Sequence, residues 1–127
     1  MDIPLSIKET QEGLLQKKFS AVDLVDSYLA NINKLNGDLN AFLTVTSERA
    51  YEDAKKVDKL ISDYGEGAFK DYPLLGVCVS YKDLFLTKGV RTTAGSKVLE
   101  AYVPAYSATV VERLEKAVAA GRDAAWI

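Results

Sequence analysis

Residues Pro73–Phe85, which read P-L-L-G-V-C-V-S-Y-K-D-L-F, form the most apolar run of the chain. Leu74–Val79 is short, rich in valine and leucine, and preceded by proline, which is typical of a buried β-strand. Two charged residues, Lys82 and Asp83, follow the apolar residues almost directly. The stretch therefore predicts a strand whose C-terminal end carries a lysine among apolar neighbours.

Two interpretations of Lys82 are open at this point. A lysine beside apolar residues can lay its alkyl stem on them and keep its ammonium in water. Alternatively, burial disfavours the charged form, and a lysine with a pKa near 7 to 8 can act as a general base. On composition alone the surface role is the more common one, and pairing with Asp83 would keep Lys82 charged.

Composition places the chain among ordinary globular proteins and excludes several kinds of site. The 127 residues are enough for one domain, with 48% apolar and 27% charged residues and a net charge of -2. The sequence has no histidine, which excludes a Ser-His-Asp triad and any histidine-ligated metal. Its one cysteine, Cys78, is expected to be a small buried hydrophobic residue.

The cysteine count and the apolar runs bear on location. A single cysteine allows no disulfide within the chain, which suits a reducing compartment. The N-terminus does not read as a signal peptide, and no apolar run approaches the roughly 18 residues of a membrane span. We therefore expect a cytoplasmic protein.

Helical periodicity is strong in the first half of the chain. Capping-box patterns at Ser6 and Ser20 predict helices over residues 7–17 and from 20 to Asn36-Gly37. Ser47 is expected to cap a third helix, whose apolar face recurs every three or four residues. That face comprises Ala50, Ala54, Val57, Ile61 and Tyr64.

The remaining segments are predicted as follows. Residues 39–45 are apolar and partly β-branched and are expected to form a strand, and residues 68–72 a polar connector. Residues 87–96 predict a loop, 97–102 a short helix, and Thr109 is expected to cap a last helix. Within the loop, Thr92, Thr93, Gly95 and Ser96 either form a turn or donate hydrogen bonds to an oxyanion.

The order of these elements indicates an α/β fold with a mixed sheet flanked by helices. A strand as apolar as residues 74–79 is expected to be covered on both faces. Only two or three strands are predicted, which is few for so buried a centre, so the fold is expected to be incomplete within these residues.

Four blocks of the sequence stand out: G-V-C-V-S-Y-K-D-L-F, T-K-G-V-R-T-T-A-G-S-K, Y-V-P-A-Y-S-A-T-V-V-E-R-L, and L-N-A-F-L-T-V followed by A-x-x-x-A-K-x-x-D. Together they resemble the N-terminal part of the amidase signature family. The resemblance covers about Ile3 to Ala117, and the order and spacing of the blocks make it specific.

The resemblance implies an activity and a role for Lys82. Members of the family hydrolyse amides with a Ser–cis-Ser–Lys triad, and Lys82 takes the place of the lysine. Within the family the chain is most similar to the glutaminase subunit of the amidotransferases that convert Glu-tRNA(Gln) to Gln-tRNA(Gln). There it would act with a B subunit, which uses ATP and Mg²⁺, and a small C subunit; no cofactor is expected in this chain.

The sequence also departs from the family pattern. The family places both triad serines tens of residues after the lysine, in a Gly/Ser-rich segment that this sequence does not contain; Ser96 and Ser107 match positions outside the triad. Residues 1–117 are expected to be the amidase segment and 118–127 a divergent tail, the product of truncation or a frameshift. Cys78 stands where proline is common.

These departures leave three functions open. We expect the chain alone to be inactive as a glutaminase, because the resemblance supplies only the lysine of the triad. A non-catalytic assembly module that docks through the N-terminal helices is one alternative. An amidase of small amides is the other.

Overall fold

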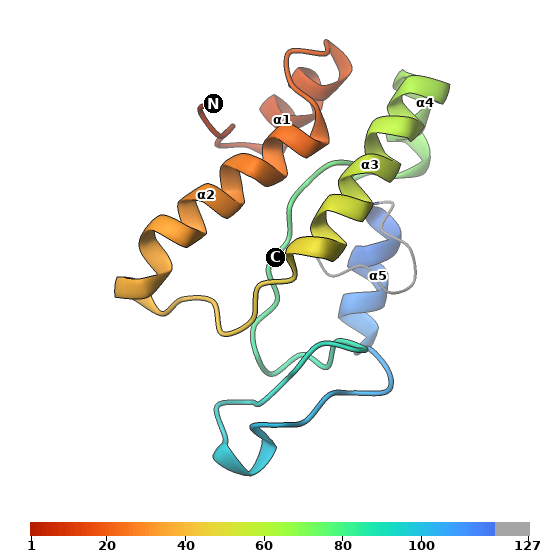
Figure 1. Ribbon diagram of the computed structural model, residues 1–127. Helices are drawn as coiled ribbons and strands as arrows, with labels where there is room; N and C mark the ends of the chain where they lie inside the picture. Colours follow the sequence, from red (N-terminus) through yellow and green to blue (C-terminus); the bar gives the residue numbers. More distant parts are fainter. Residues whose placement is uncertain (119–127) are drawn as a thin grey trace.

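A computed structural model describes residues 1–118. The chain is mostly helical: α1 (Ile7–Leu15), α2 (Ala21–Leu39), α3 (Ser47–Tyr64), α4 (Glu66–Asp71), a short 3₁₀ helix η1 (Lys97–Leu99) and α5 (Thr109–Ala117). Helices α2 and α3 run antiparallel side by side, and a long irregular segment projects away from the helices at the bottom of the view (Figure 1). We call this segment, residues 80–108, the excursion.

The first two helices begin where the sequence predicts. The hydroxyl of Ser6 accepts a hydrogen bond from the Glu9 N–H, and Ser20 forms a reciprocal capping box with Asp23. Helix α2 runs on to Leu39 instead of ending at Gly37, because Asn40 takes the left-handed conformation that stops the helix.

The predicted caps of the two later helices are wrong by one residue. Ser47 and Thr109 are the first helical residues, and neither preceding residue, Thr46 or Ala108, caps its helix with a side-chain hydrogen bond. Residues 68–72, predicted as a connector, belong largely to α4, because Ala68 is buried under the end of α3. The short helix predicted over 97–102 is limited to η1.

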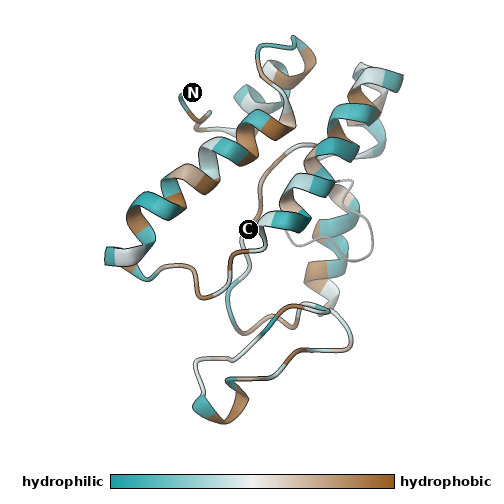
Figure 2. Ribbon diagram, in the orientation of Figure 1, coloured by the Kyte–Doolittle hydropathy of each residue, from teal (hydrophilic) through white to brown (hydrophobic). Residues whose placement is uncertain are grey.

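The core lies between α2 and α3 and is closed by α1, α4 and the residues before the excursion. Figure 2 shows that the helices carry alternating hydrophobic and hydrophilic stripes, as amphipathic helices do. On α3 the predicted face is buried as far as Ile61, whereas Tyr64 is exposed. The core residues are Leu14, Ala21, Leu24, Val25, Leu29, Ala50, Ala54, Val57, Ile61, Ala68, Leu75 and Val118.

The two predicted strands are absent from residues 1–118, and so is the mixed sheet. Residues 40–46 are irregular, and residues 74–79 form a turn followed by an extended segment; an isolated bridge joins Thr87 and Val90. The apolar pattern correctly indicates burial, since Leu75 is fully buried. A strand, however, also requires a hydrogen-bonded neighbour, and apolar composition carries no information about that neighbour.

The excursion leaves and rejoins the helices as two roughly antiparallel arms. The Ala108 N–H donates to the Leu86 carbonyl at 2.8 Å, and the Gly89 N–H to the Pro104 carbonyl at 3.0 Å. Farther out, the Thr92 N–H donates to the Tyr102 carbonyl at 3.0 Å. Residues 86–92 are thereby tied to residues 102–108.

Candidate active site around Lys82

Lys82 lies where the extended segment turns into the excursion. Its carbonyl accepts a hydrogen bond from the Phe85 N–H at 3.0 Å, so Lys82 is the first residue of a turn over residues 82–85. Its side chain is exposed and lines a hollow of about 750 Å³. The walls of the hollow come from the α2–α3 connector (residues 40–46) and from the excursion (residues 80–92).

The side chain of Lys82 has no partner among residues 1–118. No ion pair or hydrogen bond involves its ammonium there, so the pairing with Asp83 considered from the sequence is not formed. Residues 1–118 therefore leave the Lys82 side chain open to solvent. The described part of the chain presents Lys82 to an open hollow.

Asp83 points instead to the loop at residues 92–96. Its Oδ1 accepts from the Thr93 N–H at 2.8 Å, and its Oδ2 accepts from the Thr93 hydroxyl and from the Gly95 N–H at 3.4 Å. Burial alone would raise the pKa of Asp83, but these hydrogen bonds, together with the charge of Arg91, outweigh it and lower the pKa. The carboxylate is therefore held ionised by the loop.

The loop at residues 92–96 is a turn, as one of the two interpretations predicted. The Thr93 and Gly95 N–H groups are used by Asp83, and the Ser96 hydroxyl accepts from the Val98 N–H at 3.2 Å to begin η1. The other serine, Ser107, accepts from the Lys88 N–H at 2.9 Å. These donors and hydroxyls hold the excursion together.

Two arginines, which the sequence interpretation missed, tie the excursion to itself, to the α2–α3 connector and to α3. Arg91 donates to the carbonyls of Glu100 at 3.1 Å and Leu43 at 3.5 Å, and Arg49 donates to the carbonyl of Lys88 at 3.2 Å. A guanidinium carries five N–H donors in a rigid fork and can bridge several carbonyls. In the sequence, only Arg91 could have been singled out, because it stands in the G-V-R-T-T block that resembles the amidase family.

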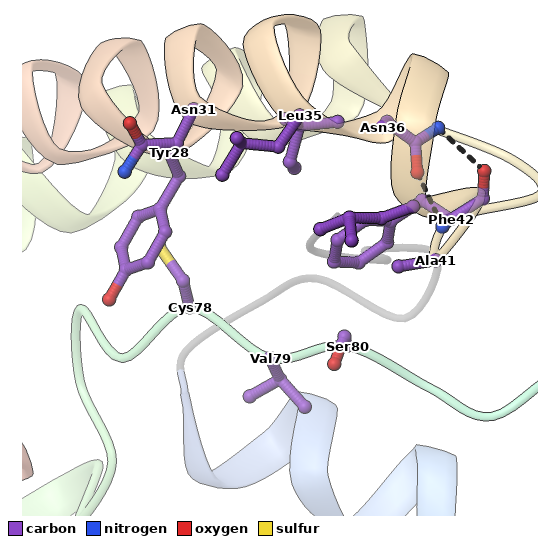
Figure 3. A pocket seen from close by; sticks show the side chains of 11 residues that line it. Tyr28, Asn31, Leu35, Asn36, Ala41, Phe42, Cys78, Val79 and Ser80 are labelled. Carbon is purple, nitrogen blue, oxygen red and sulfur yellow. Dashed lines mark hydrogen bonds between the residues drawn. The ribbon is translucent and has the colours of Figure 1, made fainter.

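A second hollow, an apolar groove of about 280 Å³, lies along the C-terminal half of α2. Figure 3 shows Cys78 and Val79 on the extended segment beneath this helix, with Cys78 close to Tyr28. Burial raises the pKa of the Cys78 thiol to about 12, so the thiol stays protonated and unreactive at neutral pH. Cys78 is only partly buried and packs against the core, so the prediction of a small buried hydrophobic residue holds in part.

Tyr81 brings a polar group into the interior beside Lys82. Its hydroxyl is buried and has no hydrogen-bond partner within the described residues. Burial, together with the charge of Glu115 on α5, raises the pKa of Tyr81 to about 12. Tyr81 therefore stays neutral at all physiological pH values.

Residues 1–118 contain neither a metal-binding cluster nor a membrane-spanning helix. No cluster of three or more histidine, cysteine, aspartate or glutamate residues there is arranged to hold a metal ion. None of the helices described is both long and apolar enough to cross a membrane.

The chain belongs to the amidase family, whose model matches residues 23–121. This match includes Lys82, Asp83 and the whole excursion. The proposed boundary between an amidase segment ending at residue 117 and a divergent tail stays a prediction, because residues 119–127 lie outside the described part of the chain.

Within the family, the chain is similar to the A subunit of glutamyl-tRNA(Gln) amidotransferase from several bacteria. It is 48% identical to that of Anaeromyxobacter dehalogenans (strain 2CP-C) over 113 residues, 89% of this chain and 22% of the relative. It is 43% identical to that of Granulibacter bethesdensis over 110 residues, 87% of this chain and 21% of the relative. The chain thus spans about a fifth of the length of these relatives.

Solved structures agree with the family. The chain superposes with a TM-score of 0.78 and 34% identity on a protein from a vestigial complex that bears on the evolutionary origins of an s-triazine catabolic enzyme. The match covers 89% of this chain and 24% of that protein. The helices and excursion described above are therefore arranged much as in one segment of that larger protein.

Proposed function

We propose that these residues form the lysine-bearing segment of the glutaminase subunit of a glutamyl-tRNA(Gln) amidotransferase. The observation that carries the proposal is the 42–48% identity to the A subunit of that enzyme over most of this chain. In the proposed reaction the complete glutaminase hydrolyses glutamine, and the ammonia converts Glu-tRNA(Gln) to Gln-tRNA(Gln).

In this proposal Lys82 is the general base of a Ser–cis-Ser–Lys triad. A neutral lysine accepts the proton of a bridging serine, which in turn takes the proton of the nucleophilic serine as it attacks the amide carbonyl. Two features support the role of Lys82: it stands in the block G-V-C-V-S-Y-K-D that resembles the lysine motif, and its ammonium faces a hollow with no partner among residues 1–118. The serine-bearing segment would close over this hollow and desolvate the lysine.

The proposal extends to partners and cofactors. The glutaminase would assemble with a B subunit, which uses ATP and Mg²⁺ to activate the tRNA-bound glutamate, and with a small C subunit. This chain would contribute no group to the binding of ATP or tRNA, in keeping with its net charge of -2. Its place of action would be the cytoplasm.

The function is tested by ammonia release from glutamine. The complete glutaminase, purified with its B and C partners, is expected to release ammonia from glutamine and, with ATP, to form Gln-tRNA(Gln). The 127-residue chain alone is expected to release none, since it carries one member of the triad. Turnover by the 127-residue chain that disappears in Lys82→Ala would contradict the second expectation.

A hydrolase of other small amides is the alternative that one observation favours. What supports it is the structural match to a protein from a vestigial complex that bears on the evolutionary origins of an s-triazine catabolic enzyme. A larger kcat/KM for a simple aliphatic amide than for glutamine in the purified complete enzyme would favour this alternative and contradict the glutaminase.

A further inference from the structure

Asp83 makes an unusual number of contacts to three consecutive residues of the excursion. Both carboxylate oxygens accept hydrogen bonds, Oδ1 from the Thr93 N–H at 2.8 Å and Oδ2 from the Thr93 hydroxyl and the Gly95 N–H. The carbonyl of Asp83 also accepts from the Ala94 N–H at 2.7 Å. Main chain and side chain of one residue are therefore both bound to the loop.

The loop takes a backbone conformation that favours this arrangement. Ala94 and Gly95 have φ values of +50° and +70°, in the left-handed region, which costs alanine roughly 1 kcal/mol. Successive N–H groups in such turns point toward one concave side and bind anions there. In this chain the anion is the carboxylate of Asp83, so the strained loop and the ionised side chain stabilise one another.

These contacts bear directly on Lys82. The residue precedes Asp83, and its side chain makes no hydrogen bond or ion pair within residues 1–118 that could fix its direction. The direction of Lys82 is therefore set by the backbone of the turn at residues 82–85, and Asp83 binds that turn to the loop at residues 92–96.

We propose that Asp83 is the positioning residue for Lys82: by binding Thr93, Ala94 and Gly95, it fixes the turn that presents the lysine to the hollow. The inference rests on the proposed function for the importance of Lys82, but the positioning itself is a property of this chain. Asparagine replaces the carboxylate poorly, because it carries no negative charge and its NH₂ group cannot accept a hydrogen bond from the Gly95 N–H.

The proposal is tested by NMR on the 127-residue chain. In the unchanged chain the backbone amide of Lys82 is expected to have an order parameter near about 0.85. In Asp83→Asn it is expected to fall below about 0.6, and hydrogen exchange at Thr93 and Gly95 is expected to accelerate about tenfold or more. Asp71→Asn, at an exposed carboxylate at the end of α4, should change neither quantity.

Faster hydrogen exchange at the amides of α2 and α3 would reveal that Asp83→Asn disturbs the fold. In that case two further variants decide the test. Thr93→Ser keeps the hydroxyl donor and should preserve the order parameter of Lys82, whereas Thr93→Val removes it and should lower that parameter. Equal order at Lys82 in these two variants would then overturn the proposal. In a folded Asp83→Asn, faster exchange at Thr93 with Lys82 still rigid would also overturn it. Because backbone order does not depend on catalysis, this result stays separate from any failure of the glutaminase function.

Discussion

Helices α2 and α3 meet through apolar side chains, whereas the excursion is held to them and to itself through hydrogen bonds. Between the helices, Val25, Ala54 and Val57 are completely buried. In the excursion, by contrast, Val98 is 92% exposed, and the contacts that give it shape come from Asp83, Arg91 and Arg49.

The packed helices form a scaffold, whereas the excursion carries the candidate site. Apolar packing is insensitive to direction but strongly stabilising, whereas hydrogen bonds fix direction and add about 1 kcal/mol each. The one residue with a proposed catalytic role, Lys82, lies in the second region. The exposed apolar side chains of the excursion are Leu84, Phe85, Val98, Leu99, Tyr102, Val103 and Tyr106. Exposed apolar side chains gathered in one segment are typical of a surface that contacts other protein.

The largest effect on stability is expected in the scaffold. Leu24→Ala removes a side chain that is 1% exposed and leaves a cavity between α2 and α3, which should lower the free energy of unfolding by about 2–5 kcal/mol. Leu5→Ala, at a side chain that is 96% exposed, is the control and should change it by less than about 0.5 kcal/mol. Urea denaturation of both variants measures the difference, and equal losses would contradict the assignment of the core.

The next effect is expected at Gly76, where the scaffold meets the extended segment. Its φ of +76° is left-handed, and an added Cβ would lie 2.3 Å from the Leu14 side chain, so Gly76→Ala should cost about 1–3 kcal/mol. Gly37→Ala is the matched control, because that position is in α2 with open space around it; it should stabilise the chain by about 0.5–1 kcal/mol. Thermal melting that gives both variants the same sign would refute this comparison.

A smaller effect is expected at Asp58, one of the polar contacts that join α2 and α3. Asp58 on α3 accepts hydrogen bonds from the Ala21 N–H at 2.7 Å and the Val22 N–H at 3.3 Å, so α3 supplies a second cap for α2. Asp58→Ala should cost about 0.5–2 kcal/mol, with Asp58→Asn in between. Chemical denaturation measures the free energy of unfolding of both variants. An unchanged value in Asp58→Ala would show that Ser20 alone is sufficient to cap α2.

The smallest effects are expected from two carboxylates, one in each region, and they have opposite signs. Burial, partly offset by Lys56, raises the pKa of Asp53 on α3, whereas hydrogen bonds lower the pKa of Asp83 despite its desolvation. Stability should therefore fall as pH rises from 3.8 through the raised pKa of Asp53, and should be lost as pH falls from 3.8 through the lowered pKa of Asp83. When the free energy of unfolding is measured against pH, Asp53→Asn should abolish the fall above pH 3.8, and Asp83→Asn should abolish the loss below pH 3.8. A pH dependence that persists in a variant would exclude the substituted residue as its source.

The sequence predicted the scaffold better than the site. Capping at Ser6 and Ser20 and the apolar face of α3 follow from residues three and four apart, which local patterns encode. The two strands were predicted wrongly, since the apolar run at residues 74–79 reports burial and not pairing. The contacts of Asp83 span 10 to 12 residues along the chain and those of Arg91 up to 48, so no local pattern announces them.

The central claim, that Lys82 is the base of an amidase, is tested most directly by ammonia release from glutamine in the complete glutaminase bound to its B and C partners. Lys82→Ala is expected to lower kcat by about 10²- to 10⁴-fold, the usual contribution of a general base. Lys97→Ala, at an exposed lysine of the same excursion, should leave kcat unchanged. A Lys82→Ala enzyme that releases ammonia as fast as the Lys97→Ala enzyme would contradict the claim.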